Sequence, residues 1–203
     1  MDGRQEGLRV VMDYKIILAS NSPRRRELLA GLDIDFEVRV LPGIDESYPP
    51  ELQGGDIPLF IAKEKAQAYV ESLKTDELLI TADTIVWLDG KVLEKPVDES
   101  DACRMLRQLS GNTHQVYTGV CLTTREKCVA FSCCTDVTFA LLTEGEILRY
   151  VRHYRPFDKA GSYGVQEWIG YIAVESINGS FYNVMGLPVQ RLYKALKQNF
   201  NIK

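Results

Sequence analysis

The sequence predicts an α/β protein in which helices flank a mixed sheet that is shaped into two lobes. Segments typical of strands and helices alternate near the start of the chain, which favours parallel pairing, whereas hairpin signals dominate its middle. The 203 residues, 45% of them hydrophobic and 26% charged, have an ordinary globular composition. This length is enough for one large domain or for two lobes around a cleft.

The first predicted elements are a strand over residues 14–20 and a helix over residues 23–30. An apolar run inside the strand segment indicates that this strand is buried. Ser22 is a good helix N-cap, Pro23 suits the first helical position, and Gly31 ends the helix.

A second strand is predicted over residues 36–40, and a proline- and glycine-containing loop separates it from a long helix over residues 57–73. Asp56 is the predicted cap of this helix, whose apolar residues fall roughly on one face. The continuous apolar run of residues 78–82 then suits a central strand.

Hairpins follow in the middle of the chain. Asp89-Gly90 between residues 84–88 and 91–94 indicates a tight hairpin, and a helix over residues 101–109 comes next. Two long antiparallel strands are predicted over residues 116–123 and 129–139. Thr143 and Glu146 form a capping box for a helix that reaches about residue 153. The last predicted elements are a strand over residues 171–176 and a helix over residues 187–198.

Three arginines, Arg24, Arg25 and Arg26, occupy the first turn of the first predicted helix. A helix N-terminus carries partial positive charge and favours acidic residues, so three cations there are unexpected unless an anion binds. Free backbone N–H groups, the helix dipole and guanidinium groups together make a phosphate site. A solvated basic turn is the alternative interpretation.

Carboxylates and a lysine are candidates for the chemistry. Asp83 follows the apolar run 78–82, at the predicted end of a central strand, where open α/β sheets usually place their sites. It could ligate a divalent cation or orient an attacking water, and a turn aspartate that caps the strand is the alternative. Glu46 could supply a second carboxylate, although alone it resembles any loop glutamate. Lys95 precedes Pro96, which holds the backbone extended and directs the lysine side chain.

Two further segments bear on a ligand. Lys63 and Lys65 are two residues apart on a predicted helix and therefore on different faces, so at most one of them points into a cleft. The loop over residues 158–166 is punctuated by glycines and could close over a ligand. Its last residue, Gln166, has both an amide donor and an acceptor and can recognise the edge of a base. A solvated glutamine is the alternative.

Composition excludes several classes of protein. The net charge of -4 argues against a general nucleic-acid-binding surface, and no apolar run approaches the length of a membrane span. The five cysteines include no C-x-x-C pair, which argues against a disulfide framework or a zinc site and fits the reducing cytoplasm. No P-loop, dinucleotide fingerprint or H-E-x-x-H motif occurs. The two histidines, His114 and His153, are interpreted as structural or exposed.

Residues 1–13 are predicted to be a flexible extension, because they are polar and lack periodicity. Residues 14–203 are predicted to form a single domain with two lobes.

Five motifs occur together: LASxSPRR at residues 18–25, ADT at 82–84, EKP at 94–96, LSGxTHxV at 109–116 and DKAGxYGxQ at 158–166. This set, in this order, resembles the Maf family of nucleotide pyrophosphatases, and the resemblance extends from about residue 14 to the C-terminus. It implies an inosine-triphosphatase-like architecture, with a long curved mixed sheet and a cleft between two lobes. It also implies hydrolysis of a nucleoside triphosphate to the monophosphate and pyrophosphate with a divalent metal cation, Mg²⁺ or Mn²⁺. A homodimer is the family-level expectation.

The family's functional positions can be transferred by motif. Asp83 matches the proton acceptor, and Glu46 matches an acidic loop residue that we hypothesise to bind the metal with Asp83. The substrate-binding positions correspond to Ser20, Arg24, Arg25, Lys65 and Lys95.

Three positions that differ between subfamilies bear on the base. They are Arg24, Thr84 and Gln166 here, which is the set of the subfamily acting on dTTP and UTP. In the subfamily acting on 7-methyl-GTP the same positions resemble tryptophan, glutamine and glutamate. The resemblance therefore implies dTTP and UTP, or modified pyrimidine nucleotides, as substrates. Two alternatives stay open: a nucleotide-binding regulator of septum formation, and a hydrolase that releases orthophosphate.

Overall fold

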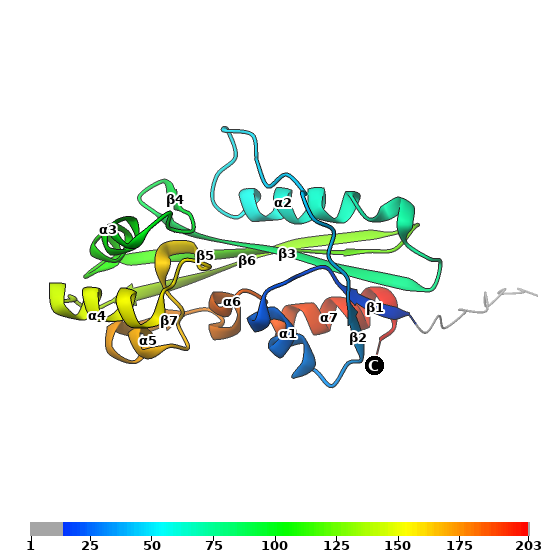
Figure 1. The fold of residues 1–203 in the computed structure, drawn as a ribbon. Coiled ribbons are helices and arrows are strands. Elements are labelled where there is room, and N and C mark those ends of the chain that lie inside the picture. The colour runs from blue at the N-terminus through cyan, green and yellow to red at the C-terminus, as the bar shows by residue number, and fades with distance from the viewer. Residues whose placement is uncertain (1–13, 203) are drawn as a thin grey trace, which may run out of the picture.

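The computed structural model describes residues 14–202, so the predicted flexible extension at residues 1–13 lies outside the described residues. Seven strands form one mixed sheet in the order β2-β1-β3-β5-β6-β7, with β4 paired to β3. Three long antiparallel strands span the molecule in Figure 1: β3 (Glu77–Leu88), β5 (Thr113–Thr123) and β6 (Cys128–Phe139). Helices cover both faces, which confirms the predicted mixed sheet flanked by helices.

The first lobe is built at one end of these long strands. β1 (Lys15–Leu18) pairs in parallel with both β2 (Phe36–Val38) and β3. Two helices cover one face of this end, α1 (Pro23–Ala30) and α7 (Val189–Phe200), and their buried leucines join one apolar cluster with β1 and β3. The opposite face is covered by α2 (Asp56–Gln67), which packs on β3 and β5 and is followed by a short 3-10 turn (Val70–Ser72).

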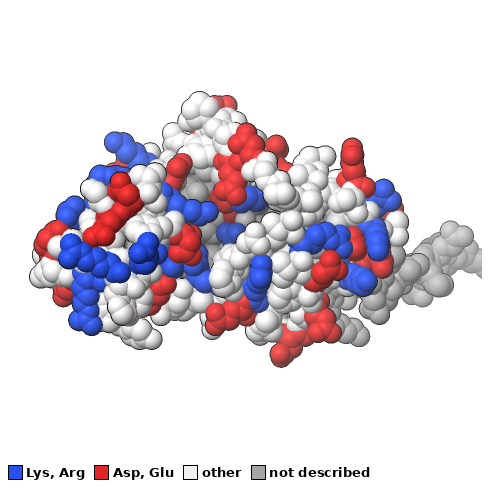
Figure 2. Space-filling model, in the orientation of Figure 1, with Lys and Arg blue, Asp and Glu red and all other residues white. Residues whose placement is uncertain are grey.

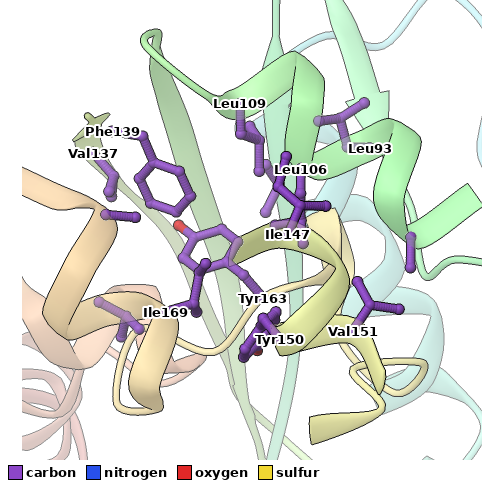
Figure 3. Packing of buried hydrophobic residues seen from close by; sticks show 14 of the residues in the cluster. Leu93, Leu106, Leu109, Val137, Phe139, Ile147, Tyr150, Val151, Tyr163 and Ile169 are labelled. Carbon is purple, nitrogen blue, oxygen red and sulfur yellow. The ribbon is translucent and has the colours of Figure 1, made fainter. Parts of the chain in front are cut away.

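The second lobe occupies the other end of the sheet. Its elements are β4 (Lys91–Leu93), α3 (Glu99–Leu109), α4 (Glu144–Tyr154), a 3-10 turn (Ala160–Ser162), α5 (Trp168–Ala173) and β7 (Val174–Asn178). Figure 3 shows their core, where Tyr163 and Phe139 lie among aliphatic side chains of α3 and α4. His114 is fully buried in this core beside Tyr163, and burial lowers its pKa to about 4, which fits the structural interpretation. A short helix, α6 (Phe181–Met185), leads back to the first lobe.

The edge of β3 is open where the two lobes meet. β1 pairs with β3 only as far as Ile80, and β4 begins to pair at Val86. β5 occupies the opposite edge of β3 without interruption from Leu79 to Trp87. The stretch of β3 between Ile80 and Val86 therefore faces a gap in the sheet, and Asp83 lies at its middle.

Local signals predicted most elements well. Ser22 caps α1 by accepting a hydrogen bond from the Arg25 backbone N–H at 3.4 Å, and Gly31 ends the helix. The capping box of Thr143 and Glu146 is present at α4. The β3–β4 turn has positive φ at both Asp89 and Gly90, as the hairpin signal requires.

Some predictions were wrong. β3 runs through Asp83 without a break, so this residue lies inside a strand rather than at its end. Asp56 begins α2 without capping it through its side chain. Residues 171–173 belong to α5, not to a strand, and α6 was not predicted. Among residues 14–202, every helix is too short or too polar to cross a membrane.

Candidate active site

A cavity of about 550 Å³ lies between the lobes, at the gap along β3. The space-filling view in Figure 2 shows a hollow in the middle of the molecule, with Lys and Arg side chains exposed inside it. The nine positions assigned from the family motifs all line this cavity: Ser20, Arg24, Arg25, Glu46, Lys65, Asp83, Thr84, Lys95 and Gln166. We call this cavity the cleft.

Lys65 joins two carboxylates in the cleft. Its Nζ donates to Asp83 Oδ1 at 2.9 Å and lies 2.9 Å from Glu46 Oε1. The side chains of Lys65 and Asp83 are 13% and 12% exposed, whereas that of Glu46 is 53% exposed. Burial raises the pKa of Glu46, but the hydrogen bond and charge of Lys65, together with the charges of Lys95 and Arg25, outweigh this effect and hold the pKa below its usual value. Lys63, two residues earlier, lines a different cavity, as the helix spacing predicted.

The loop that carries Glu46 is held by a buried tyrosine. The hydroxyl of Tyr69, which is 1% exposed, donates to the Arg39 carbonyl at 3.1 Å and accepts from the Leu41 N–H at 2.7 Å. Lys65 lies on α2, and Tyr69 follows this helix. The same region of the chain therefore carries Lys65 and fixes the start of the loop that brings Glu46 to Lys65.

The N-terminus of α1 faces the cleft. Ser20 is buried at the end of β1, and its Oγ accepts from the Ser22 N–H at 3.2 Å, which tightens the turn into the helix. Arg24 reaches across to the second lobe, where its Nη1 donates to Asp158 Oδ2 at 2.9 Å. The two lobes thus meet at the cleft through an ion pair that involves one of the predicted phosphate ligands.

The guanidinium of Arg25 makes three hydrogen bonds within the protein, which the sequence did not indicate. Its Nε donates to the Gly186 carbonyl at 2.8 Å, and its Nη1 donates to the Ala82 carbonyl at 2.9 Å. Its Nη2 donates to Thr84 Oγ1 at 3.0 Å. Burial is the main cause that lowers the pKa of this guanidinium. Arg25 lines the cleft and also connects α1 to the open edge of β3 and to the end of α6.

Thr84 is held from the other side by a second threonine. Thr84 Oγ1 lies 2.9 Å from Thr118 Oγ1 on β5, and Thr118 donates to the Asn183 carbonyl at 3.1 Å. Thr118 and Asn183 are both fully buried. Since Thr118 uses its proton on Asn183, the Thr84 hydroxyl donates to Thr118 and accepts from Arg25. Both of these hydrogen bonds of the Thr84 hydroxyl are therefore made within the protein, and the bond accepted from Arg25 holds that guanidinium in place.

The second lobe supplies the opposite wall of the cleft. The Oε1 of Gln166 is buried and lacks a hydrogen-bond partner in the structure. Lys159, which is 8% exposed, lines the cleft and pairs with Asp158 at 2.7 Å and with Glu167 at 3.1 Å. Sequence reasoning did not single out Lys159, because a lysine in a glycine-containing loop is usually solvated. Its place beside Asp158 in the DKAG motif was the only signal.

Oxygen ligands for a hard cation are present in the cleft. Glu46 and Asp83 place two carboxylates on the same cavity. Mg²⁺ is commonly bound by one or two carboxylates together with phosphate oxygens of a substrate, so this donor set fits such an ion. No group of three or more His, Cys, Asp or Glu side chains that could hold a metal occurs within residues 14–202.

The cleft thus brings cations from both lobes next to two carboxylates beside the open edge of β3, an arrangement that suits a phosphate-containing ligand of an α/β protein. A family model described as Maf-like protein matches residues 15–199, and the chain belongs to the Maf family.

Curated relatives align along most of the chain. A protein named dTTP/UTP pyrophosphatase from Bacteroides fragilis is 65% identical over 185 residues, which are 91% of this chain and 96% of the relative. Proteins of the same name from Porphyromonas gingivalis and Flavobacterium johnsoniae are 58% and 48% identical, over 91% and 90% of this chain and 94% of each relative. A solved structure of a HAM1 protein from Coxiella burnetii is similar with a TM-score of 0.48 and 12% identity, over 91% of this chain and 99% of that one.

Proposed function

We propose that this protein hydrolyses dTTP and UTP to the monophosphate and pyrophosphate. Membership of the Maf family and the shared name of its relatives support this proposal. The observation that carries it is the pairing of Asp83 and Glu46 through Lys65 in a cleft whose walls bring cations from both lobes.

The triphosphate is proposed to bind among these cations. Concentrated positive charge and charge-assisted hydrogen bonds are what a polyphosphate requires. Arg24, Lys65 and Lys95 line the cleft, and the backbone N–H groups at the start of α1 add further donors. Ser20 shapes the turn before this helix. Arg25 contributes a fixed positive charge, with part of its donor set held by the protein.

Asp83 is proposed to accept the proton of the attacking water. A general base must be held within hydrogen-bond reach of that water, and Lys65 fixes the orientation of the Asp83 carboxylate. Water attack at the α-phosphorus releases pyrophosphate, whose developing charge requires nearby cations. Lys95 and Arg24 are proposed to meet this requirement.

A divalent cation is proposed to be held by Glu46 and Asp83 with phosphate oxygens of the substrate. When bound, it supplies charge neutralisation at the phosphates and polarises the phosphorus centre for attack. Mg²⁺ and Mn²⁺ both suit carboxylate and phosphate ligands.

Recognition of the base is assigned to the second-lobe wall. A uracil or thymine edge offers two carbonyl acceptors and an N–H donor, and an amide can pair with both kinds of group. The unpaired Oε1 of Gln166 is ready to accept the base N–H, and its amide nitrogen can donate to a carbonyl. Thr84 is proposed to affect selectivity through Arg25, and Arg24 through its position at the mouth of the cleft.

Three broader expectations belong with this function. Residues 14–203 are proposed to act as one two-lobed domain, since β3, β5 and β6 are shared by both lobes. A cytoplasmic location is proposed from the cysteine pattern of the sequence, which includes no C-x-x-C pair. A homodimer remains the family-level expectation.

A nucleotide panel tests the proposed function. Turnover of dTTP, UTP, CTP, dATP, GTP and 7-methyl-GTP is measured with Mg²⁺ or Mn²⁺, and pyrophosphate is resolved from orthophosphate. Selective release of pyrophosphate from dTTP and UTP is expected. Release of orthophosphate would replace the proposal with a different hydrolase. Binding without turnover of any nucleotide would favour a regulatory binding protein.

A further inference from the structure

A second cavity, of about 400 Å³, lies between the C-terminal half of α2 and the turn that joins β5 to β6. None of its lining residues is shared with the cleft. Two of the five cysteines, Cys121 on β5 and Cys128 on β6, lie at its wall. We call these two residues the dithiol pair.

The two sulfurs of the dithiol pair face each other. Strand pairing places Cys128 opposite Thr123, so Cys121 and Cys128 lie diagonally on the same face of the sheet. Their Sγ atoms are 3.1 Å apart. The Thr123 hydroxyl lies 3.2 Å from the Cys121 sulfur and 3.8 Å from the Cys128 sulfur. A disulfide bond is about 2.05 Å long, so the sulfurs are about 1 Å outside bonding distance.

We propose that the dithiol pair is an oxidation site, at which a small hydroperoxide such as hydrogen peroxide converts Cys121 and Cys128 into an intramolecular disulfide. Cys128 is exposed and is the first residue of β6 after the turn, so its thiol is open to a small oxidant. Cys121 is fully buried, at the wall of the cavity.

The proposed chemistry has two balanced steps. The Cys128 thiolate attacks one peroxide oxygen, the O–O bond breaks, and hydroxide leaves with a proton from solvent as water, which produces a sulfenic acid. The Cys121 sulfur then attacks the Cys128 sulfur, the S–O bond breaks, and the hydroxyl leaves with the Cys121 proton as a second water. The two sulfurs lose two electrons in total to one peroxide.

The environments of the two thiols set this order. Burial is the main cause that raises the pKa of Cys121 to about 12, so this residue stays a thiol and does not react first. Lys63 lies near enough to Cys121 to favour its thiolate slightly, and Arg125 and Lys127 also line the cavity. Cys128, which is exposed, is therefore the attacking group, and Cys121 is the resolving thiol.

Peptide mapping tests the site with a matched control. The reduced protein is treated with increasing hydrogen peroxide, alkylated and digested without reductant. We expect a peptide that links Cys121 to Cys128, with loss of two hydrogens from the intact mass, both reversed by reductant. Cys128→Ser should abolish the link, whereas Cys134→Ser, which changes another exposed cysteine of β6, should leave it intact.

Two further measurements keep the result interpretable. Cys128→Ser is expected to turn over UTP at the wild-type rate, since neither sulfur lines the cleft, and this confirms that the variant is folded. A sulfenic-acid trap should label Cys128 in the Cys121→Ser variant and not in the wild type. A wild-type protein that accumulates trapped sulfenic acid at Cys128 without the internal link would overturn the proposal. A Cys128 link between two chains would overturn it as well.

Discussion

Asp83 contacts its partners from within a largely apolar strand. Most of its neighbours along β3 are buried, yet its carboxylate lines the cleft and meets Lys65. An unpaired buried carboxylate would be costly, so the lysine both stabilises the charge and fixes its direction. The same cation holds Glu46, which makes Lys65 the centre of the carboxylate arrangement.

The Asp83→Asn variant tests the proposed base. The amide keeps the size of the side chain but does not accept a proton, so turnover of UTP should fall by roughly 10²–10⁴-fold, the usual contribution of a general base. The melting temperature and nucleotide affinity are measured beside kcat. Asp89→Asn, at an exposed turn position of the same hairpin, is the control and should be unaffected. A variant within a few-fold of wild type would remove Asp83 from this role.

The Gln166→Glu variant tests recognition of the base. A carboxylate accepts hydrogen bonds but does not donate them, so one carbonyl contact of uracil or thymine is lost. Because an unpaired buried polar group costs about 1–3 kcal/mol, kcat/KM for UTP and dTTP should fall by roughly 10–100-fold. Gln190→Glu, at an exposed position of α7, is the control. If the ratios among nucleotides stay unchanged in Gln166→Glu, then this residue does not read the base.

At the scale of elements, β5 pairs with one edge of β3 and so supports the open edge on the other side of that strand. Thr118 of β5 connects Thr84 to the backbone of α6, and through Thr84 it steadies Arg25 of α1. Four elements are therefore tied together by hydroxyl groups at the floor of the cleft.

The Thr118→Val variant should weaken substrate binding. Losing the hydroxyl leaves Thr84 and the Asn183 carbonyl each short of a partner, which should cost about 1–3 kcal/mol of stability. Arg25 loses part of its support, so KM for UTP should rise more than kcat falls. Thr118→Ser retains the hydroxyl and should restore KM, which a purely packing role would not explain. Equal KM values in the valine and serine variants would contradict this account.

An ion pair with a buried carboxylate joins the residue after β2 to the start of β3 in the first lobe. Glu77, at the start of β3, is 1% exposed and accepts hydrogen bonds from Arg39 at 2.8 and 3.0 Å. These bonds are the main cause that lowers the pKa of Glu77 from 4.5 to about 2. The ionised carboxylate therefore stabilises the fold above about pH 4.5, and this stabilisation is lost as the pH falls toward 2.

The pH dependence of unfolding checks this ion pair. At about 1.4 kcal/mol per pKa unit, the loss should approach roughly 3 kcal/mol between pH 5 and pH 2. The free energy of unfolding in urea is measured across this range. Glu77→Gln should be less stable at pH 5 and show a shallower decline, whereas Glu71→Gln, at an exposed position, should follow the wild type. Parallel curves for Glu77→Gln and wild type would contradict the assignment.

At the scale of the whole molecule, the cleft exists because two lobes share one set of long strands. Apolar clusters fill the sheet faces at both ends, and the polar residues of β3 and β5 lie where the two main clusters meet. The Arg24–Asp158 ion pair then bridges the cleft between the lobes. Substrate phosphates would compete with Asp158 for Arg24.

Sequence patterns predicted local features better than tertiary ones. Ser22, Gly31 and the Thr143 capping box act on their own neighbours, so helix ends could be predicted. The break expected at Asp83 was wrong because tertiary contacts with Lys65 permit a carboxylate within a strand. The hydrogen bonds of Arg25 reach residues that are 57, 59 and 161 positions away, and the burial of Lys159 depends on how its loop folds, so no local pattern encodes either feature.

The position of water attack tests the central claim most directly. UTP is hydrolysed by the wild-type protein in ¹⁸O-labelled water, the products are separated, and their masses are measured by mass spectrometry. Attack at the α-phosphorus, in the cleft around Asp83, predicts one labelled oxygen in UMP and none in pyrophosphate. Label in pyrophosphate with unlabelled UMP would place the attack at the β-phosphorus, and labelled orthophosphate would indicate another bond; either result would contradict the account.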